Sequence, residues 1–131
     1  MTTTEAIQDV INVYNRVVDD REFERLREIF DAETRYWLPD GLHIGVDSAI
    51  AGLEGIFADG RSTRHWTANT SITQLDDVTA QAVSDLFLME ARDGAWIVTI
   101  VGRYHDRLRC IDGRWMFAER QITYVPIPGG S

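Results

Sequence analysis

The sequence predicts an α+β fold in which N-terminal helices pack against one face of a strongly curved, mostly antiparallel sheet. Two observations support this prediction. The first half of the chain carries apolar side chains mainly at the three- and four-residue spacing of amphipathic helices, whereas residues 63–124 contain four long strand-like runs. Short turns separate these runs, as in a meander of hairpins. A curved sheet covered by helices encloses a pocket.

Two helices are predicted at the start of the chain. Thr2 has capping-box spacing to Glu5, and the apolar positions that follow recur at helical spacing as far as Val18. After an interruption by charged residues, a second short helix begins near Phe23 and ends near Asp31. We expect the two helices to form a bent pair.

A short strand, a turn and a third helix are predicted next. Residues 35–38 are typical of a strand, and Pro39-Asp40-Gly41 is typical of a tight turn, because proline presets the backbone and glycine accepts a positive φ. Asp47 or Ser48 is expected to cap the third helix, whose apolar stripe reaches Phe57. A loop then leads into the first long strand.

The predicted hairpin turns lie at Asp76-Asp77, Asp93-Gly94 and Asp112-Gly113. The Asp-Gly pairs suit a type I′ turn, which needs positive φ at both central positions. Residues 126–131 contain two prolines and two glycines, so this tail is expected to lie on the surface. We expect a single domain over residues 1–131.

Composition limits the partners of the chain. Hydrophobic residues make up 44% and charged residues 26%, and the formal net charge of -8 disfavours nucleic acid and anionic membrane surfaces. Without a secretory signal or a membrane-spanning apolar run, a cytoplasmic location is expected. One cysteine, Cys110, and three scattered histidines give no metal-ligand spacing, and there is no glycine-rich phosphate loop, so neither metal nor cofactor is expected. A small neutral or weakly charged molecule is the expected partner.

The best functional lead is the strand expected over residues 63–69. Side chains alternate along a strand, so His65, Thr67 and Asn69 are predicted to share one side and Trp66 to take the other. An imidazole titrates near neutral pH and can serve as a general base. The alternative is a partly buried histidine that is satisfied by a neighbour.

The strand expected over residues 95–111 has an apolar side that also carries Tyr104 and Asp106, while Arg103 belongs to the solvated side. Asp106 is either a functional acid or a rim carboxylate paired with an arginine such as Arg120. Apolar side chains that could line a pocket for a ring-containing, polycyclic or terpenoid-like ligand are Trp37, Leu53, Ile56, Phe57, Trp66 and Phe87. Of all these residues, the candidate substrate contacts are Trp37, Leu53, Phe57, Asn69, Phe87 and Asp106.

Short motifs follow one another along nearly the whole chain. They are the D-x3-F-x2-L-x3-F pattern from Asp19 to Phe30, Pro39-Asp40-Gly41 with Gly45, Thr63-Arg64-His65 with Asn69, Gly102-Arg103-Tyr104 with Asp106, and Asp112-Gly113-Arg114-Trp115. With the order of helices and strands, this pattern resembles the polyketide-cyclase-like (SnoaL-like) branch of the nuclear transport factor two-like superfamily. The resemblance implies a cone-shaped α+β barrel, and function varies widely among proteins of this fold.

The resemblance also implies site residues. Scytalone dehydratases, bile-acid dehydratases and hexachlorocyclohexane dehydrochlorinases of this superfamily use an aspartate from the first helix and a histidine from the first long strand, which match Asp19 and His65. The bile-acid dehydratases add a tyrosine five residues before the aspartate, which matches Tyr14. Helical geometry alone, however, turns Asp19 away from Tyr14 and toward solvent, so the helix end would have to loosen or turn.

The function expected from this pattern is that of a cofactor-independent lyase or isomerase of the dehydratase type, acting on a hydrophobic, ring-containing small molecule. His65 would remove a proton, Asp19 would fix its tautomer, and Tyr14 would donate a hydrogen bond to the substrate, with Asn69 as a second polar contact. The resemblance further implies a homo-oligomer, either a dimer or a trimer, that covers the outer surface of the sheet.

Alternatives of other classes remain open. A non-catalytic binding or assembly module predicts that Asp19 and His65 lie too far apart to hydrogen-bond. An epoxide hydrolase of the limonene type would need an arginine beside aspartates, for which Arg103 and Asp106 are the loosely similar pair, and a polyketide-type cyclase is a further possibility. Ketosteroid isomerases of the superfamily carry their basic carboxylate on the short strand after the helices, where this chain has Arg35-Tyr36-Trp37-Leu38. That difference disfavours an isomerase of their kind.

Overall fold

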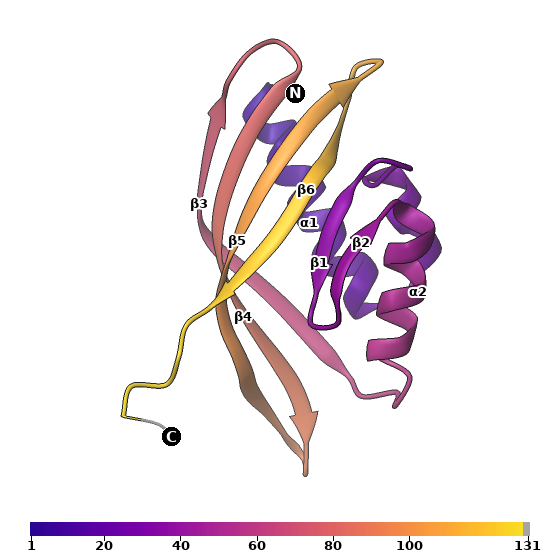
Figure 1. Cartoon of the computed structure of the whole chain (residues 1–131). Coiled ribbons are helices and arrows are strands. Elements are labelled where there is room, and N and C mark those ends of the chain that lie inside the picture. Colours follow the sequence, from indigo (N-terminus) through magenta and orange to yellow (C-terminus); the bar gives the residue numbers. More distant parts are fainter. Residues whose placement is uncertain (130–131) are drawn as a thin grey trace.

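The structure is a computed structural model that describes residues 1–129 of the chain. Figure 1 shows its α+β architecture, in which long strands lie beside helices and a short hairpin. In chain order the elements are α1 (Thr3–Asp19), the 3₁₀ helix η1 (Phe23–Glu28), β1 (Arg35–Leu38), β2 (Gly41–Ile44), α2 (Val46–Ile56), β3 (Thr63–Gln74), β4 (Thr79–Arg92), β5 (Ala95–Ile111) and β6 (Arg114–Tyr124).

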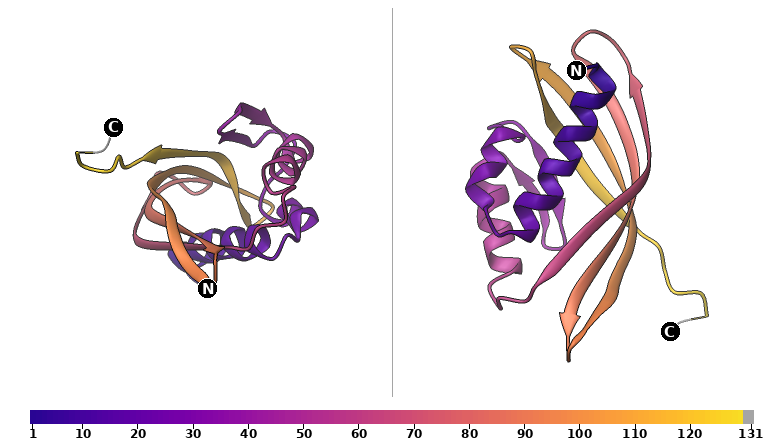
Figure 2. Two further views of the ribbon diagram at one scale, coloured as in Figure 1. Left: turned by 90° about the horizontal axis from the view of Figure 1, so that it is seen from below. Right: turned by 180° about the vertical axis from the view of Figure 1, so that it is seen from behind.

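The strands form one six-stranded sheet in the order β2-β1-β6-β5-β4-β3. Every neighbouring pair is antiparallel except β1 and β6, which run parallel where Arg35 and Tyr36 pair with Glu119 and Arg120. Seen from below, the sheet curls into an arc and the helices close its open side (Figure 2). The predicted α+β fold with a strongly curved, mostly antiparallel sheet is therefore confirmed.

The helix α1 forms because its sequence satisfies both its end and its inner face. The Thr2 side chain accepts a hydrogen bond from the Glu5 backbone, and the Glu5 side chain accepts one from the Thr2 backbone, which completes the predicted capping box. Ile7, Ile11 and Val17, at helical spacing, are fully buried. Burial of this apolar stripe against the sheet stabilises α1 far more than its intrinsic propensity does.

Two details of the region before β3 differ from the predictions. The helix α2 begins at Val46 with Gly45 as its N-cap, so neither Asp47 nor Ser48 caps it. Gly45 has a φ of 90°, and a Cβ there would lie 2.9 Å from the Ala32 carbonyl oxygen, so only glycine fits this entry into the helix. The strand β2 was not predicted, because its four residues are too few to show a period.

The expected alternation along β3 fails at Asn69. The register of β3 against β4 shifts between Ala68 and Ser71, and Asn69 takes a positive φ of 54°. This bulge adds a residue to β3 and changes the phase of the side chains that follow. Asn69 is exposed and donates a hydrogen bond to Asp85, so it does not share the side of His65.

The remaining elements agree with their predictions in outline. The second helix is a 3₁₀ helix that ends at Glu28. The hairpin turns lie where they were predicted, with Asp93 and Asp112 at positive φ, each before a glycine at positive φ. Residues 126–129 form no strand and are exposed, whereas 130–131 lie outside the described part of the chain. None of the helices in residues 1–129 has the length and apolar character needed to cross a membrane.

Candidate active site

A cavity of about 150 Å³ lies between the helices and the concave face of the sheet. Apolar side chains from both layers make most of its wall, including Val18 of α1, Trp37 and Leu38 of β1, Leu53 and Ile56 of α2, and Leu86 and Leu88 of β4. A small set of polar side chains interrupts this wall: Tyr14, Tyr36, Arg61, His65, Tyr104, Arg120 and Tyr124. A mostly apolar cavity with few converging polar groups is the usual form of a small-molecule site.

The Asp19 carboxylate and the His65 imidazole are in direct contact at the edge of this cavity. Asp19 Oδ1 lies 2.6 Å from His65 Nδ1, and Asp19 Oδ2 accepts a hydrogen bond of 2.8 Å from the His65 backbone N–H. The two side chains are only 8% and 7% exposed, respectively. Within residues 1–129, His65 Nε2 makes no hydrogen bond, so the imidazole has one committed and one available nitrogen.

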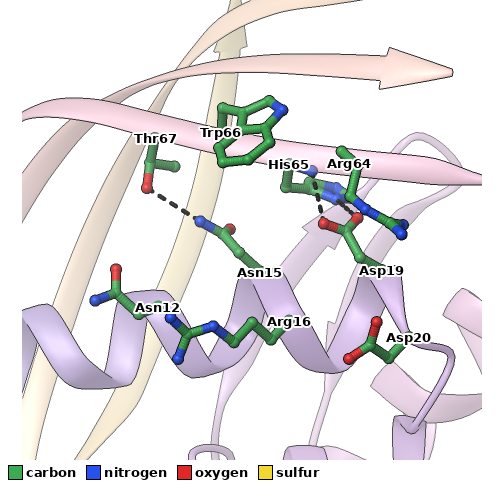
Figure 3. A pocket seen from close by; sticks show the side chains of 9 residues that line it. All are labelled: Asn12, Asn15, Arg16, Asp19, Asp20, Arg64, His65, Trp66 and Thr67. Atoms are coloured by element: carbon green, nitrogen blue, oxygen red, sulfur yellow. Dashed lines mark hydrogen bonds and ion pairs between the residues drawn. The ribbon is translucent and has the colours of Figure 1, made fainter. Parts of the chain in front are cut away.

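Asp19 is buried although the helical period turns it away from the apolar stripe. The strand β3 crosses over the C-terminal end of α1 and covers Asp19, as Figure 3 shows. The helix stays regular through Asp19 and the chain turns directly after it, at Asp20 and Arg21. Of the two expected arrangements, the helix end turns and does not loosen. On the outer side of the pair, Asn12, Asn15, Arg16, Asp20, Arg64, Trp66 and Thr67 line a separate polar groove (Figure 3).

A buried polar cluster forms another part of the cavity wall. The hydroxyls of Tyr14 and Tyr36 hydrogen-bond to each other, and the Arg120 guanidinium lies 4.1 Å from the Tyr14 ring centroid and 3.5 Å from that of Tyr104. Such stacking of a guanidinium on aromatic faces is favourable when both are desolvated. Burial raises the pKa of Tyr14 and of Tyr36, so both phenols stay protonated and can donate hydrogen bonds.

The charge of Arg120 is balanced by Asp106. Arg120 Nε lies 3.3 Å from Asp106 Oδ1, and both side chains are fully buried. Burial raises the pKa of the Asp106 carboxyl to about 6, while Arg120 acts in the opposite direction. The contact lacks hydrogen-bond geometry, and none of the Arg120 nitrogens has a hydrogen-bond partner in the described part of the chain. Because an unmet buried donor is costly, Arg120 is a candidate to bind a ligand oxygen or water.

The structure places the other predicted contact residues in different positions. Trp37, Leu53 and Phe57 lie in the cavity wall. Phe87 does not, because the inward positions of β4 are Leu86 and Leu88, and Phe87 is 41% exposed on the opposite face. The expectation that Phe87 lines the pocket is therefore wrong.

Asp106 and Asn69 also lie away from the cavity wall. Asp106 pairs with Arg120, which agrees with one of the two alternatives proposed from the sequence. The pair is fully buried, however, and does not lie at a rim. Asp106 lies outside the cavity lining, which Arg120 reaches instead. Asn69 lies beyond the bulge of β3 and is exposed. Arg103 pairs with Asp85 at 2.8 Å, so the pair of Arg103 with Asp106 that an epoxide hydrolase would need is not formed.

Tyr36, Tyr104 and Arg120 line the cavity although none of them was predicted as a site residue. Tyr104 was assigned to the inward side of its strand, and only its role was overlooked. Arg120 was expected only as a possible partner of a rim carboxylate, and its place in the cavity wall was not foreseen, because the shift in register between β5 and β6 near Ala118 is invisible in the sequence. Tyr36 follows Arg35 and precedes Trp37 in a strand of four residues, where alternation gives little guidance.

The curved open sheet, with helices that cover its concave face and enclose an apolar cavity, defines an α+β protein with a candidate small-molecule site. A family model of the SnoaL-like domain matches residues 1–121, and the chain belongs to this family. This confirms the resemblance deduced from the motifs. A search of curated protein sequences found no match.

Solved structures share the fold at low sequence identity. A scytalone dehydratase-like protein from Novosphingobium aromaticivorans superposes with a TM-score of 0.80 at 23% identity, over 94% of this chain and 84% of that one. ActVI-ORFA from Streptomyces coelicolor gives 0.83 at 19% identity, over 94% and 98%. A hexachlorocyclohexane dehydrochlorinase, LinA type 2, gives 0.79 at 19% identity, over 97% and 95%. At these identities the likeness establishes the fold.

Proposed function

We propose that the protein is a cofactor-independent lyase of the dehydratase type, with His65 as its general base. The observation that carries the proposal is the contact between Asp19 and His65 Nδ1 at the cavity wall, which leaves Nε2 without a partner among residues 1–129. A general base must reach its proton directly, and Nε2 belongs to a ring that lines the cavity. A non-catalytic module was expected to hold Asp19 and His65 too far apart to hydrogen-bond, so the 2.6 Å separation favours the enzyme.

The proposed reaction begins with removal of a proton from a carbon atom next to a carbonyl group. His65 Nε2 takes this proton, and the negative charge of Asp19 stabilises the imidazolium that forms. The electron pair of the broken C–H bond then forms a C=C bond as a hydroxyl group on the next carbon leaves. The imidazolium returns its proton to the departing hydroxide, so the products are an unsaturated ketone and water.

The buried polar cluster supplies hydrogen-bond donors for the substrate oxygen. One proton of the Tyr14–Tyr36 pair is used between the two hydroxyls, which leaves the other for a ligand. The unpartnered N–H groups of Arg120 are further donors on the same cavity. Donors fixed in a water-poor site stabilise the enolate charge that develops during proton removal. Tyr14 keeps the role expected for it, and Arg120 takes the place proposed for Asn69.

The cavity favours a small hydrophobic substrate with a single ring. Its volume of about 150 Å³ is similar to that of an apolar protein cavity that accommodates benzene. The apolar wall disfavours hydrophilic acids. We therefore propose a cyclic β-hydroxy ketone as the substrate class, in place of the polycyclic compounds that the sequence alone suggested.

The test is dehydration of a series of cyclic β-hydroxy ketones, followed by ultraviolet absorbance of the conjugated product. His65→Ala should lower kcat by about a hundredfold to ten-thousandfold, the usual contribution of general acid-base catalysis. His105→Ala is the matched control, because His105 lies on the exposed face and, among the described residues, its side chain hydrogen-bonds only to Thr123 Oγ1. Full activity of the His65→Ala variant would contradict the mechanism.

We also propose that the outer sheet face pairs with a second copy of the chain. Trp66, Phe87 and Val101 lie on neighbouring strands in register and are each between 41% and 52% exposed. Asp85 and Arg103 lie beside them, and in a two-fold contact each of these charges can pair with the opposite charge on the second copy. Phe87→Asp should lower the mass measured by light scattering to that of one chain, whereas an already monomeric wild type would refute the pairing.

A further inference from the structure

The Asp19–His65 pair continues into a series of hydrogen bonds through Thr63 and Arg21. Thr63, two residues before His65 on β3, is fully buried, and its hydroxyl lies 3.2 Å from Asp19 Oδ1. Arg21, two residues after Asp19, places Nη1 3.0 Å from the same hydroxyl. The hydrogen bonds therefore connect Arg21 to Thr63, Thr63 to Asp19, and Asp19 to His65.

The directions of these hydrogen bonds follow from the charges of Arg21 and Asp19. A guanidinium has only donors, so the Thr63 oxygen must accept from Arg21. The hydroxyl proton of Thr63 is then free to point at Asp19, and an ionised Asp19 can only accept. His65 must consequently carry a proton on Nδ1, which leaves the lone pair of the neutral imidazole on Nε2.

Arg21 is held firmly in this role. It has a φ of 59°, a left-handed conformation that is strained for a residue other than glycine. Its guanidinium also donates to the carbonyls of Val18 and Arg61 and lies 4.1 Å from the centre of the Phe57 ring. These contacts aim Nη1 at Thr63.

We infer that Thr63 and Arg21 are positioning residues that set the tautomer and basicity of His65 through Asp19. The inference rests on the proposed function, because it concerns the same Asp-His pair. Thr63 stabilises the Asp19 charge with one hydrogen bond, and so limits how strongly Asp19 holds a proton on His65. Loss of the hydroxyl should leave Asp19 a stronger acceptor and raise the pKa of His65.

Other charged or titratable groups near His65 stay unchanged in the variants of Thr63. Those that line the outer groove with it are Arg16, Asp19, Asp20 and Arg64. Those that line the cavity with it are Tyr14, Tyr36, Arg61, Tyr104, Arg120 and Tyr124. A difference between Thr63→Val and Thr63→Ser therefore isolates the hydroxyl.

The experiment is an NMR titration of His65 by long-range proton–nitrogen correlation, which reports the tautomer and the pKa without any substrate. We expect the Nδ1–H tautomer in the wild type. Thr63→Val should raise the pKa of His65 by about half a unit, on the scale of a lost hydrogen bond, while Thr63→Ser should titrate like the wild type. Thr67→Val is the matched control, since Thr67 lies on the same strand and bonds Asn15 instead of Asp19.

The outcomes separate this inference from the proposed function. If Thr63→Val and Arg21→Met both titrate like the wild type while Asp19→Asn shifts His65, the pair stands and the positioning role is overturned. If Asp19→Asn also leaves His65 unchanged, both proposals fail. If Thr63→Val does not fold, the pKa of His65 in Arg21→Met should be compared with that in Arg21→Lys, because only lysine retains the positive charge and a hydrogen-bond donor. Equal pKa values of His65 in these two variants would overturn the inference.

Discussion

The buried Asp106 carboxyl should make the stability of the protein depend on pH in an unusual direction. Burial raises its pKa from 3.8 to about 6 in the folded state. Between these two values the folded chain binds a proton that the unfolded chain lacks. Folding is thus favoured as the pH falls through 6 toward 4, whereas most paired carboxylates act the other way.

The size of the effect follows from the pKa difference. A separation of about 2.2 units is equivalent to about 3 kcal/mol at full protonation, of which roughly 2 kcal/mol develops between about pH 7.5 and about pH 4.5. Asp106→Asn cannot titrate, so its stability should lack this component. The measurement is the free energy of unfolding in urea at several pH values, followed by tryptophan fluorescence.

The control and the refuting result are both defined by the structure. Asp85 is an exposed carboxylate whose pKa is lowered by hydrogen bonds from Arg103 and Asn69, so Asp85→Asn should change the pH dependence in the opposite direction. Parallel curves for the wild type and Asp106→Asn would refute the reasoning. Because Asp106→Asn leaves the Arg120 charge buried without its partner, the double variant Asp106→Leu with Arg120→Met should be measured as well, and its curve should also lack the component.

Three further predictions concern stability. Gly45→Ala should destabilise the protein by roughly 1 kcal/mol or more beyond the effect of Gly113→Ala, as measured by urea unfolding. Both glycines have a positive φ, but only at Gly45 would the new Cβ meet a backbone atom, 2.9 Å away. Equal effects of the two substitutions would contradict this reasoning. Leu53→Ala should lower the free energy of unfolding by about 2–5 kcal/mol, because Leu53 is only 2% exposed. The enlarged cavity should also bind a larger ring, as measured by calorimetry. An unchanged limit on ligand size would argue against the place of Leu53 in the cavity wall. Thr2→Ala should lower the free energy of unfolding by about 1 kcal/mol, because the capping box is lost. An unchanged stability would mean that this end of the helix is frayed in solution.

Elements that repeat a period over many residues were predictable from the sequence. The helix α1 and the four long strands each show such a period, and their turns carry the residues that positive φ requires. The meander of the four long strands and the α+β class follow from these elements, whereas the pairing of β1 with β6 does not. The short strand β2 and the start of α2 at Gly45 depend instead on contacts with Ala32 and β1, which no local pattern records.

The site was only partly predictable, and the reason is the phase of the strands. His65 and Tyr104 were assigned to the correct sides of their strands by alternation. The bulge at Asn69 and the register shift near Arg120 each change that phase. Asn69 was therefore expected inside and lies outside, whereas Arg120 was expected at a rim and is fully buried. Asp19 is covered by a strand that begins more than forty residues later, and helical periodicity cannot include such a neighbour.

The pairing of β1 with β6 joins the early part of the chain to its last strand. Thr34 donates a hydrogen bond to the Phe117 carbonyl across 83 positions of sequence, and Ile29 accepts one from the Phe117 backbone. Contacts between residues so far apart in sequence form slowly, because the entropy cost of closing a large loop comes before the favourable energy of the contacts. A chain emerging from the ribosome therefore has Asp19 and His65 available well before Arg120 completes the wall, and until then the apolar concave face lies open to other chains. Synthesis at low temperature or with chaperones should accordingly raise the soluble yield, since the vulnerable interval ends only when β6 docks.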